Sequence, residues 1–258
     1  MDGLFAVDGL RVLVTGGSRG IGAMIAEGFV RHGAEVFITA RKAGEVEATA
    51  TRLAALGPCR GIPADLADLT GIEAVAAAIE AQASSLDVLV NNAGAVWAER
   101  FEAFTPEAWD KVMTVNLKSV FFLTRRLHPL MKAAATERPD RSPRVINIGS
   151  IDGLHVPPLE TYPYSASKAG LHHLTRTLAA RLASDGIRVN CIAPGPFESR
   201  MMAATLASMG DAIRAANPLG RIGTPEDVAG TAIFLAARAS DYITGAVIPV
   251  DGGTSTTL

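Results

Sequence analysis

The sequence predicts an α/β fold with one doubly wound parallel sheet of about seven strands and helices on both faces. Short, β-branched apolar runs alternate with segments of helical periodicity along the chain of 258 residues. The first run, at residues 11–15, leads directly into a glycine-rich turn. Because no repeat, low-complexity tract or linker separates a second unit, we expect one domain over residues 1–258.

Each element follows from its local pattern. Apolar runs bounded by turn residues indicate strands at 11–15, 35–40, 59–63, 86–90, 144–148, 187–193 and 246–250. Apolar side chains at helical spacing indicate helices at about 21–32, 44–56, 72–83, 106–135, 163–186 and 225–237. Gly33 ends the first of these helices, and Pro163 suits the first turn of the fifth.

Two segments lack such periodicity. Residues 137–143 are rich in charge and proline, which predicts an exposed loop. Residues 195–224 carry several Met and Gly residues, and we expect them to form a mobile flap of short helices over the substrate.

Composition argues against several classes of function. With 19% charged residues and a net charge of -2, the chain has no basic field for nucleic acid. No apolar run approaches the ~20 residues of a membrane span. The first basic residue is Arg11, which is unlike a secretory signal, so we expect a cytoplasmic protein. Cys59 and Cys191 occur without ligand-like spacing, which predicts reduced thiols and no metal site.

Tyr164 and Lys168 are four residues apart on a predicted helix, so their side chains share one face. An ammonium beside a phenol favours the phenolate and lowers a pKa that is ordinarily about 10. The pair therefore predicts a general acid that works near neutral pH.

A glycine turn follows the first strand. In a parallel sheet, ligands bind at the carboxyl ends of the strands. Gly16, Gly20 and Gly22 would let the backbone approach a pyrophosphate at the N-terminus of the first helix. This position favours a dinucleotide over a merely structural turn.

Together, the glycine turn and the Tyr164/Lys168 pair resemble the short-chain dehydrogenase/reductase family, which has a Rossmann-type fold. The resemblance runs from about Leu4 to Gly253. Further matches occur in the order of the family, namely Asn91-Asn92-Ala93-Gly94 after the fourth strand, Asn116, Ser150 at the end of the fifth strand, and Pro194-Gly195 after the sixth.

The resemblance implies a nicotinamide cofactor and a set of residues that bind it. Those residues are Gly16, Ser18, Arg19, Gly20, Ile21, Gly22, Asp65, Leu66, Asn92, Ala93, Gly94, Tyr164, Lys168, Pro194 and Gly195. Asp65 is expected beside the adenine ring, or else as the N-cap of the next helix. Asn91 is expected to tie neighbouring backbone together.

The resemblance also implies four catalytic roles. Tyr164 donates a proton to the carbonyl oxygen that receives hydride at carbon, and Lys168 lowers the pKa of Tyr164 and binds the nicotinamide ribose. Ser150 holds the carbonyl oxygen. Asn116 holds a water that connects Lys168 with solvent.

The end of the second strand predicts NADP(H) rather than NAD(H). A 2′-hydroxyl is usually bound by an acid about 20 residues after the glycines, whereas a 2′-phosphate requires cations. Here Ala40 is followed by Arg41 and Lys42, and Arg19 adds a third cation. The alternative is that Arg41 and Lys42 simply begin a solvated helix.

The expected substrate pocket is largely apolar and includes Tyr162, Phe197 and Met201. Residues 194–201 are also similar to the branch of β-ketoacyl reductases associated with rhamnolipid synthesis. We therefore expect an NADPH-dependent reductase of a ketone, most simply a 3-oxoacyl thioester. A dehydrogenase of a sugar acid or another secondary alcohol is the alternative, and a cofactor-binding regulator without catalysis is a remote third.

Members of the family commonly form homotetramers through two helices beside the active site and through the C-terminal strand. The resemblance therefore implies a homotetramer or homodimer here. The sequence alone does not separate interface positions from core positions on the helix after Pro163.

Overall fold

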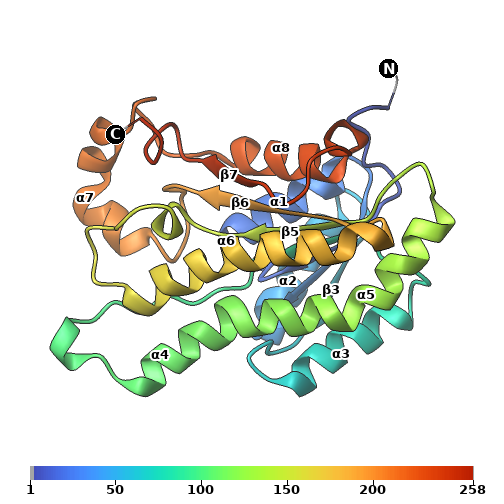
Figure 1. Ribbon diagram of the computed structural model, residues 1–258, viewed down its shortest axis with the longest axis horizontal. Coiled ribbons are helices and arrows are strands. Elements are labelled where there is room, and N and C mark those ends of the chain that lie inside the picture. The colour runs from blue at the N-terminus through green and yellow to red at the C-terminus, as the bar shows by residue number, and fades with distance from the viewer. Residues whose placement is uncertain (1–2, 258) are drawn as a thin grey trace.

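Seven parallel strands form one sheet in the computed structural model, which describes residues 3–257 (Figure 1). Their order is β3-β2-β1-β4-β5-β6-β7, and every neighbouring pair is parallel. This confirms the predicted doubly wound sheet, while positions 1, 2 and 258 lie outside the described residues. The strands are β1 (Arg11–Thr15), β2 (Glu35–Ala40), β3 (Cys59–Pro63), β4 (Val88–Asn91), β5 (Arg144–Ile148), β6 (Arg188–Pro194) and β7 (Val247–Val250).

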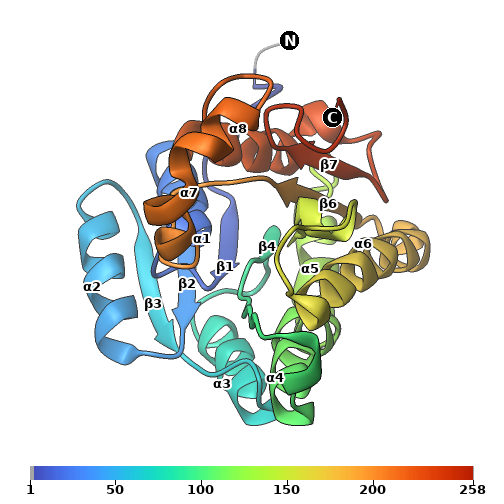
Figure 2. The same cartoon turned by 90° about the vertical axis from the view of Figure 1, so that its left-hand side faces the viewer.

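Helices cover both faces of the sheet (Figure 2). The first three helices are α1 (Gly20–Arg31), α2 (Ala43–Ala54) and α3 (Leu69–Glu80). The others are α4 (Pro106–Met113), α5 (Ser119–Glu137), α6 (Tyr162–Leu182), α7 (Ala203–Ala216) and α8 (Pro225–Ala236). Helices α1, α2 and α8 pack on one face, and α3, α5 and α6 pack on the other. Within residues 3–257, no helix combines the length and apolar character that crossing a membrane requires.

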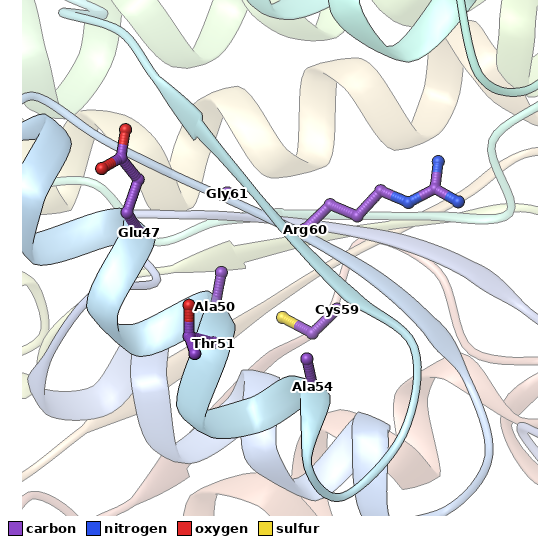
Figure 3. A pocket seen from close by; sticks show the side chains of 7 residues that line it. All are labelled: Glu47, Ala50, Thr51, Ala54, Cys59, Arg60 and Gly61. Atoms are coloured by element: carbon purple, nitrogen blue, oxygen red, sulfur yellow. The ribbon is translucent and has the colours of Figure 1, made fainter.

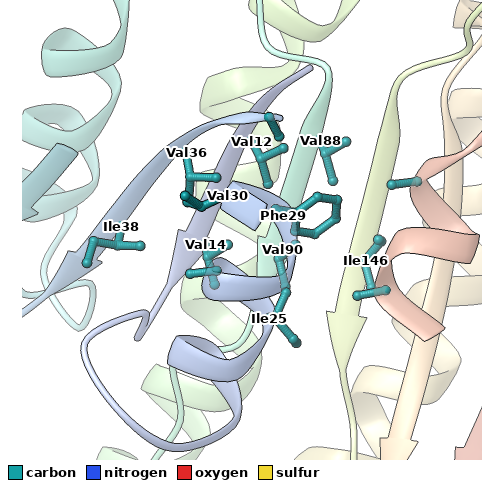
Figure 4. Close-up of a cluster of buried hydrophobic side chains, with 14 of the residues drawn as sticks. Val12, Val14, Ile25, Phe29, Val30, Val36, Ile38, Val88, Val90 and Ile146 are labelled. Carbon is teal, nitrogen blue, oxygen red and sulfur yellow. The ribbon is translucent and has the colours of Figure 1, made fainter. Parts of the chain in front are cut away.

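Strand β1 shows why the core strands are apolar at consecutive positions. Val12 and Val14 point into one core cluster, where they pack with Ile25 and Phe29 of α1 (Figure 4). Leu13, between them, points to the opposite face and joins the second core cluster. Because successive strand residues alternate between faces and both faces are covered, every position is buried.

The predicted helix at 106–135 is not one regular helix. It consists of α4 and α5, joined by a π-helical turn, η2 (Thr114–Lys118). Such turns are rare and often occur at functional sites. The turn contains Asn116, one of the predicted catalytic residues.

Other elements also differ from the sequence prediction, most by one to four residues at an end. Helix α3 spans Leu69–Glu80, with Asp68 as its N-cap, so Ala83 follows the helix. Strand β4 begins at Val88, two residues later than predicted. The flap does not consist of short helices, because its central part is the 14-residue helix α7.

A buried arginine joins the amino end of the sheet to α8. Arg144 begins β5, and its side chain is almost inaccessible to solvent. Its Nε donates to the carbonyl of Leu235 (3.0 Å) and its Nη2 to that of Ala237 (3.2 Å), at the end of α8. The guanidinium also pairs with Asp241. Arg144 and Ser240 thus share the carbonyls at the end of α8, where a cation is favoured by the helix dipole.

Candidate active site

The loops after β1 and β4 meet where the strand order reverses. Gly16 follows β1 with a φ of +64°, and a Cβ there would lie 2.9 Å from Nδ2 of Asn92. Gly20, with a φ of +53°, begins α1. Arg19 is the N-cap of α1 and provides no side-chain cap. The first N–H groups of α1 are therefore able to bind an anion.

Asn92 holds the two loops together. Its Nδ2 donates to the carbonyl of Thr15 (2.8 Å), and its backbone N–H and that of Ala93 both donate to Oγ1 of Thr15 at 2.9 Å. The backbone role predicted for Asn91 is thus wrong. The amide of Asn91 instead donates to side chains, to Oγ1 of Thr124 and to Oδ1 of Asn147.

The predicted cations lie at the end of β2 and in the glycine turn. Lys42 and Arg19 both pair with Glu45 of α2, at 2.9 Å and 3.3 Å. Arg41 lies beside them and is exposed. No acid occupies the end of β2, where Ala40 stands. The end of β2 and the glycine turn therefore present three cations, two of which pair with Glu45.

At the end of β3, the structure corrects one alternative. The N-cap of α3 is Asp68, which accepts from the N–H of Thr70, so Asp65 is not that cap. Asp65 accepts a hydrogen bond from the N–H of Ala67. The side chain of Leu66 is buried in the second core cluster, which leaves only its main chain for a contact in the site.

The remaining predicted cofactor residues lie along the same edge. Ile21 and Gly22 lie in the first turn of α1, and the carbonyl of Ser18 accepts from Oγ1 of Thr49 on α2. Pro194 ends β6, and the N–H of Gly195 donates to Val250 of β7.

Tyr164 and Lys168 lie in the first turns of α6, which starts at Tyr162 with Pro163 in its first turn. Nζ of Lys168 is 5.5 Å from the centroid of the Tyr164 ring and donates to the carbonyl of Ile148 at 2.7 Å. A Cβ at Gly94 would lie 3.9 Å from this Nζ and 3.4 Å from Oδ1 of Asn116. The predicted catalytic lysine and asparagine thus meet at the loop after β4.

The pKa values of the pair differ from the expectation. Burial raises the pKa of Tyr164 to about 12, although a hydrogen bond with Ser150 opposes the rise. Burial also lowers the pKa of Lys168 to about 8. The predicted lowering of the Tyr164 pKa is therefore wrong for this structure, because burial and the nearby Asp152 raise it more than the hydrogen bond with Ser150 lowers it. At neutral pH the phenol is protonated.

Ser150 lies between β5 and a short 3₁₀ turn, η3 (Ile151–Gly153). Its Oγ accepts from the N–H of Asp152 (3.1 Å) while its hydroxyl lies against Tyr164. The carboxyl of Asp152 is close enough to act on both Tyr164 and Lys168, and burial raises its own pKa. Asp152 is an acid of the site that the sequence analysis does not single out.

Asn116 is buried, and its side chain is engaged with protein groups. Nδ2 donates to the carbonyl of Ala95 (2.9 Å) and to Oγ of Ser167 (3.0 Å), and Oδ1 accepts from the N–H of Ala95 (2.8 Å). Both amide hydrogens are used. The side chain therefore holds the loop after β4 against α6, and a water would have to bind a remaining acceptor.

The predicted substrate residues separate into two groups. Tyr162 is 40% exposed, donates to Glu160, and forms edge-to-face contacts with Phe101 and Phe104. Met201 is also exposed. Phe197, in contrast, is 1% exposed and belongs to the first core cluster, where its ring packs against Gly223. The predicted place of Phe197 in the substrate wall is wrong.

A groove of about 230 Å³ lies elsewhere, between α2 and the edge strand β3 (Figure 3). Its lining includes Glu47, Cys59 and Arg60. None of the predicted catalytic or cofactor residues takes part in it. The chemistry therefore belongs to the carboxyl ends of the strands rather than to this groove.

Comparison of the sequence and the structure with known proteins identifies the family of the chain. Residues 16–255 match the family described as enoyl-(acyl carrier protein) reductase. The rhamnolipids biosynthesis 3-oxoacyl-(acyl-carrier-protein) reductase of Pseudomonas aeruginosa is 47% identical over 251 residues, which cover 96% of this chain and 97% of that protein. The chain belongs to the short-chain dehydrogenase/reductase family. It is therefore an NAD(P)-dependent oxidoreductase that acts on alcohol or carbonyl groups.

The relatives within the short-chain dehydrogenase/reductase family include both reductases and dehydrogenases. Gluconate 5-dehydrogenase of Gluconobacter oxydans is 34% identical and covers 99% of this chain and 98% of its own. Among solved structures, the RhlG/NADP active-site complex of Pseudomonas aeruginosa superimposes with a TM-score of 0.94 at 46% identity, covering 99% of this chain and 100% of that one. Gluconate 5-dehydrogenase of Burkholderia cenocepacia, in complex with NADP and tartrate, gives 0.90 at 32% identity, covering 99% of each chain.

His172 is a further residue of this site that the sequence analysis does not single out. It lies one helical turn after Lys168 and is buried against Gly149 and Gly153, on either side of Ser150. Among the described residues, neither ring nitrogen has a hydrogen-bond partner. Burial lowers the pKa of His172 to about 4, so the ring is neutral. The i+4 spacing from Lys168 was the signal that could have found it.

Proposed function

We propose that the chain is an NADPH-dependent carbonyl reductase, and that its substrate is a 3-oxoacyl thioester or a similar ketone. The observation that carries the proposal is the meeting of Ser150, Tyr164 and Lys168 beside the loop after β4, which itself packs against the glycine turn. A protonated phenol, a hydroxyl and an ammonium are the groups that a carbonyl oxygen needs as it becomes an alcohol. We treat residues 1–258 as one cofactor-binding and catalytic unit.

The residues around the glycine turn fit a dinucleotide phosphate. The uncapped N-terminus of α1 faces an edge where Gly16 and Gly20 leave room for close approach. Arg19, Arg41 and Lys42 would bind the 2′-phosphate of NADP(H), and no carboxylate at the end of β2 would claim a 2′-hydroxyl. The NADP complexes of related structures support this assignment.

When bound, the cofactor supplies the hydride. Tyr164 supplies the proton, because its raised pKa of about 12 keeps the hydroxyl protonated at rest. As the proton moves to the substrate oxygen, the phenolate that remains is stabilised by the Lys168 ammonium on the same face of α6. Ser150 donates a second hydrogen bond to the same oxygen.

The other two residues position this machinery. Lys168 is held by the carbonyl of Ile148, which uses one of its three N–H groups. The others would bind the nicotinamide ribose. Asn116 orders the loop that carries Ala93 and Gly94. A water on Asn116 that replenishes the proton remains part of the proposal.

The surroundings of the site support an apolar substrate. Exposed apolar side chains near its entrance come from the loop after β4, from the segment after β5 and from the flap, and they include Trp97, Leu154, Val156, Leu159 and Met201. Such walls suit an acyl chain better than a polyhydroxy acid. The identity to the rhamnolipids biosynthesis 3-oxoacyl reductase points the same way.

A comparison of substrates tests the proposal. Purified protein is given acetoacetyl-CoA with NADPH or NADH, and in parallel gluconate with NADP⁺ or NAD⁺, while absorbance at the nicotinamide band is followed. We expect the largest kcat/KM for acetoacetyl-CoA with NADPH. A higher kcat/KM for gluconate would replace the reductase by the alternative, a sugar-acid dehydrogenase, which relatives in Gluconobacter and Burkholderia support.

We further propose a homodimer or homotetramer. Trp109 on α4 and Phe121 on α5 are exposed apolar side chains on the outer helix layer, and β7 is an edge strand. Sedimentation velocity of the purified chain would measure the assembly, and a monomer would contradict the proposal. The cytoplasmic location remains a prediction from the sequence.

A further inference from the structure

Glu45 gathers cations from three separate segments. Its carboxylate lies 2.9 Å from Nζ of Lys42, 3.3 Å from Nη1 of Arg19 and 3.7 Å from Nη1 of Arg200. Lys42 precedes α2, Arg19 lies in the glycine turn, and Arg200 belongs to the flap. A single carboxylate therefore links both walls of the proposed phosphate site with the segment that covers it.

Packing, independently of charge, brings the flap to this position. A Cβ on Gly20 would lie 3.2 Å from Cβ of Ser199, the residue before Arg200. The flap backbone thus lies against the glycine turn. Arg200 reaches the cation cluster because its neighbour in the chain is packed there.

The charges around Glu45 determine what it does to a phosphate. The hydrogen bond from Lys42, together with the nearby guanidinium groups, lowers the pKa of Glu45, so the group is ionised at neutral pH. Its partners are half exposed or more, and such ion pairs contribute little to stability. A phosphate, with more charge and three oxygens, is therefore able to take these cations from Glu45.

We propose that Glu45 and Arg200 set the strength of NADPH binding in opposite directions. Arg200 is a fourth cation for the 2′-phosphate, delivered by the flap. Glu45 is an internal competitor that occupies the cations and repels the phosphate, so it limits the preference for NADPH over NADH. The inference rests on the proposed NADP(H) function and adds two residues to it.

Direct binding tests the inference without catalysis. Dissociation constants of NADPH and NADH are measured by nucleotide fluorescence for the wild type, Glu45→Gln and Arg200→Gln. We expect Glu45→Gln to bind NADPH about 3- to 10-fold tighter and Arg200→Gln about 3- to 10-fold weaker, with changes below about twofold for NADH. The affinity of Arg200→Gln should also depend less on salt.

Two matched variants serve as controls. Glu47→Gln removes the same charge from α2, but Glu47 lies over the groove with β3 (Figure 3), and no ion pair within residues 3–257 involves it. Arg214→Gln removes a flap cation that pairs with Asp211 on α7. Both should keep wild-type affinities for the two nucleotides, and thermal melting of each variant checks that it is folded.

The outcomes separate this inference from the proposed function. If the wild type binds NADPH no tighter than NADH, the proposed NADPH preference is wrong. If the wild type prefers NADPH but Glu45→Gln and Arg200→Gln match their controls, the inference alone is overturned. Equal changes for NADPH and NADH would also overturn it, because they would show no action on the 2′-phosphate.

Discussion

Both ends of the sheet carry buried polar or charged groups, but the two ends differ in how many hydrogen-bond partners those groups have. At the amino end, Arg144 is bonded to three carbonyls and paired with Asp241, and Asp87 accepts from the N–H of Arg11 and pairs with Arg138. At the carboxyl end, Lys168 donates to one carbonyl, and no described residue is bonded to the ring nitrogens of His172. One end is saturated, and the other retains unused hydrogen-bonding capacity.

This difference shows how the fold separates stability from chemistry. A buried charge with all its partners holds elements together, and losing one partner is costly. A buried group with few partners keeps hydrogen-bonding capacity for a ligand, as Lys168 does. We therefore expect substitutions at the carboxyl end to change rates and those at the amino end to change stability.

The largest effect is expected for Tyr164→Phe. The change removes the proton donor and keeps the ring, so kcat/KM for ketone reduction should fall by about 10³-fold, equivalent to about 4 kcal/mol of transition-state stabilisation. Steady-state kinetics measures the loss. The melting temperature should be unchanged, because among the described contacts of the hydroxyl only Ser150 would be affected.

Tyr162→Phe is the matched control for that prediction. Tyr162 precedes Tyr164 by two residues, and its hydroxyl donates to Glu160. We do not expect it to supply a proton to the substrate. Its kcat/KM should remain within about fivefold of the wild type, because exposed hydrogen bonds contribute about 1 kcal/mol or less. Retained activity in Tyr164→Phe, or an equal loss in both variants, would contradict the assigned acid.

The next largest effect is expected for Arg144→Met at the other end. The variant removes the buried guanidinium from the carbonyls of Leu235 and Ala237, which keep only Ser240 as a donor, and it breaks the pair with Asp241. The free energy of unfolding should fall by about 3 kcal/mol. Urea denaturation measures it. The kcat per folded molecule should stay near the wild-type value, and a large loss of kcat in a stable Arg144→Met protein would break the proposed separation of the two ends.

The sequence is sufficient to predict most of the fold, because strands buried on both faces consist of consecutive apolar residues. Strands β1, β2, β3 and β5 match their predicted bounds. The π-helical turn at Asn116 was not predictable, since apolar spacing does not distinguish it from an α-helical turn. The flap helix α7 was missed because its residues are mostly exposed, so its sequence carries no clear apolar periodicity.

Within the site, motifs predicted which residues meet but not their environment. The spacing of Tyr164 and Lys168 implies a shared face, yet the pKa of Tyr164 depends on burial by distant segments. Phe197 was placed in the substrate wall because it is apolar and follows Pro194-Gly195, but packing with Gly223 draws it into the core. The link between Glu45 and Arg200 likewise depends on where the flap lies.

The smallest predicted effect concerns pH. Lys168 must be protonated to stabilise the phenolate, and burial lowers its pKa to about 8, although Asp152 of η3 and Cys191 of β6 oppose the shift. As pH rises through 8, the ammonium is lost, so kcat/KM should fall by up to about tenfold per pH unit. Over this range the amino end should not respond, because Arg144 stays protonated despite a pKa lowered by burial.

Asp152→Asn sharpens this last prediction. Removing the carboxylate removes an interaction that raises the pKa of Lys168, so the falling limb of kcat/KM should move to lower pH. Initial rates of ketone reduction between pH 6 and 10 would record the limb in both proteins, and urea denaturation over the same range would record stability. A limb that stays in place in Asp152→Asn would mean that the limb reports a group other than Lys168. A limb that moves while stability stays flat would assign the titration to the carboxyl end of the sheet.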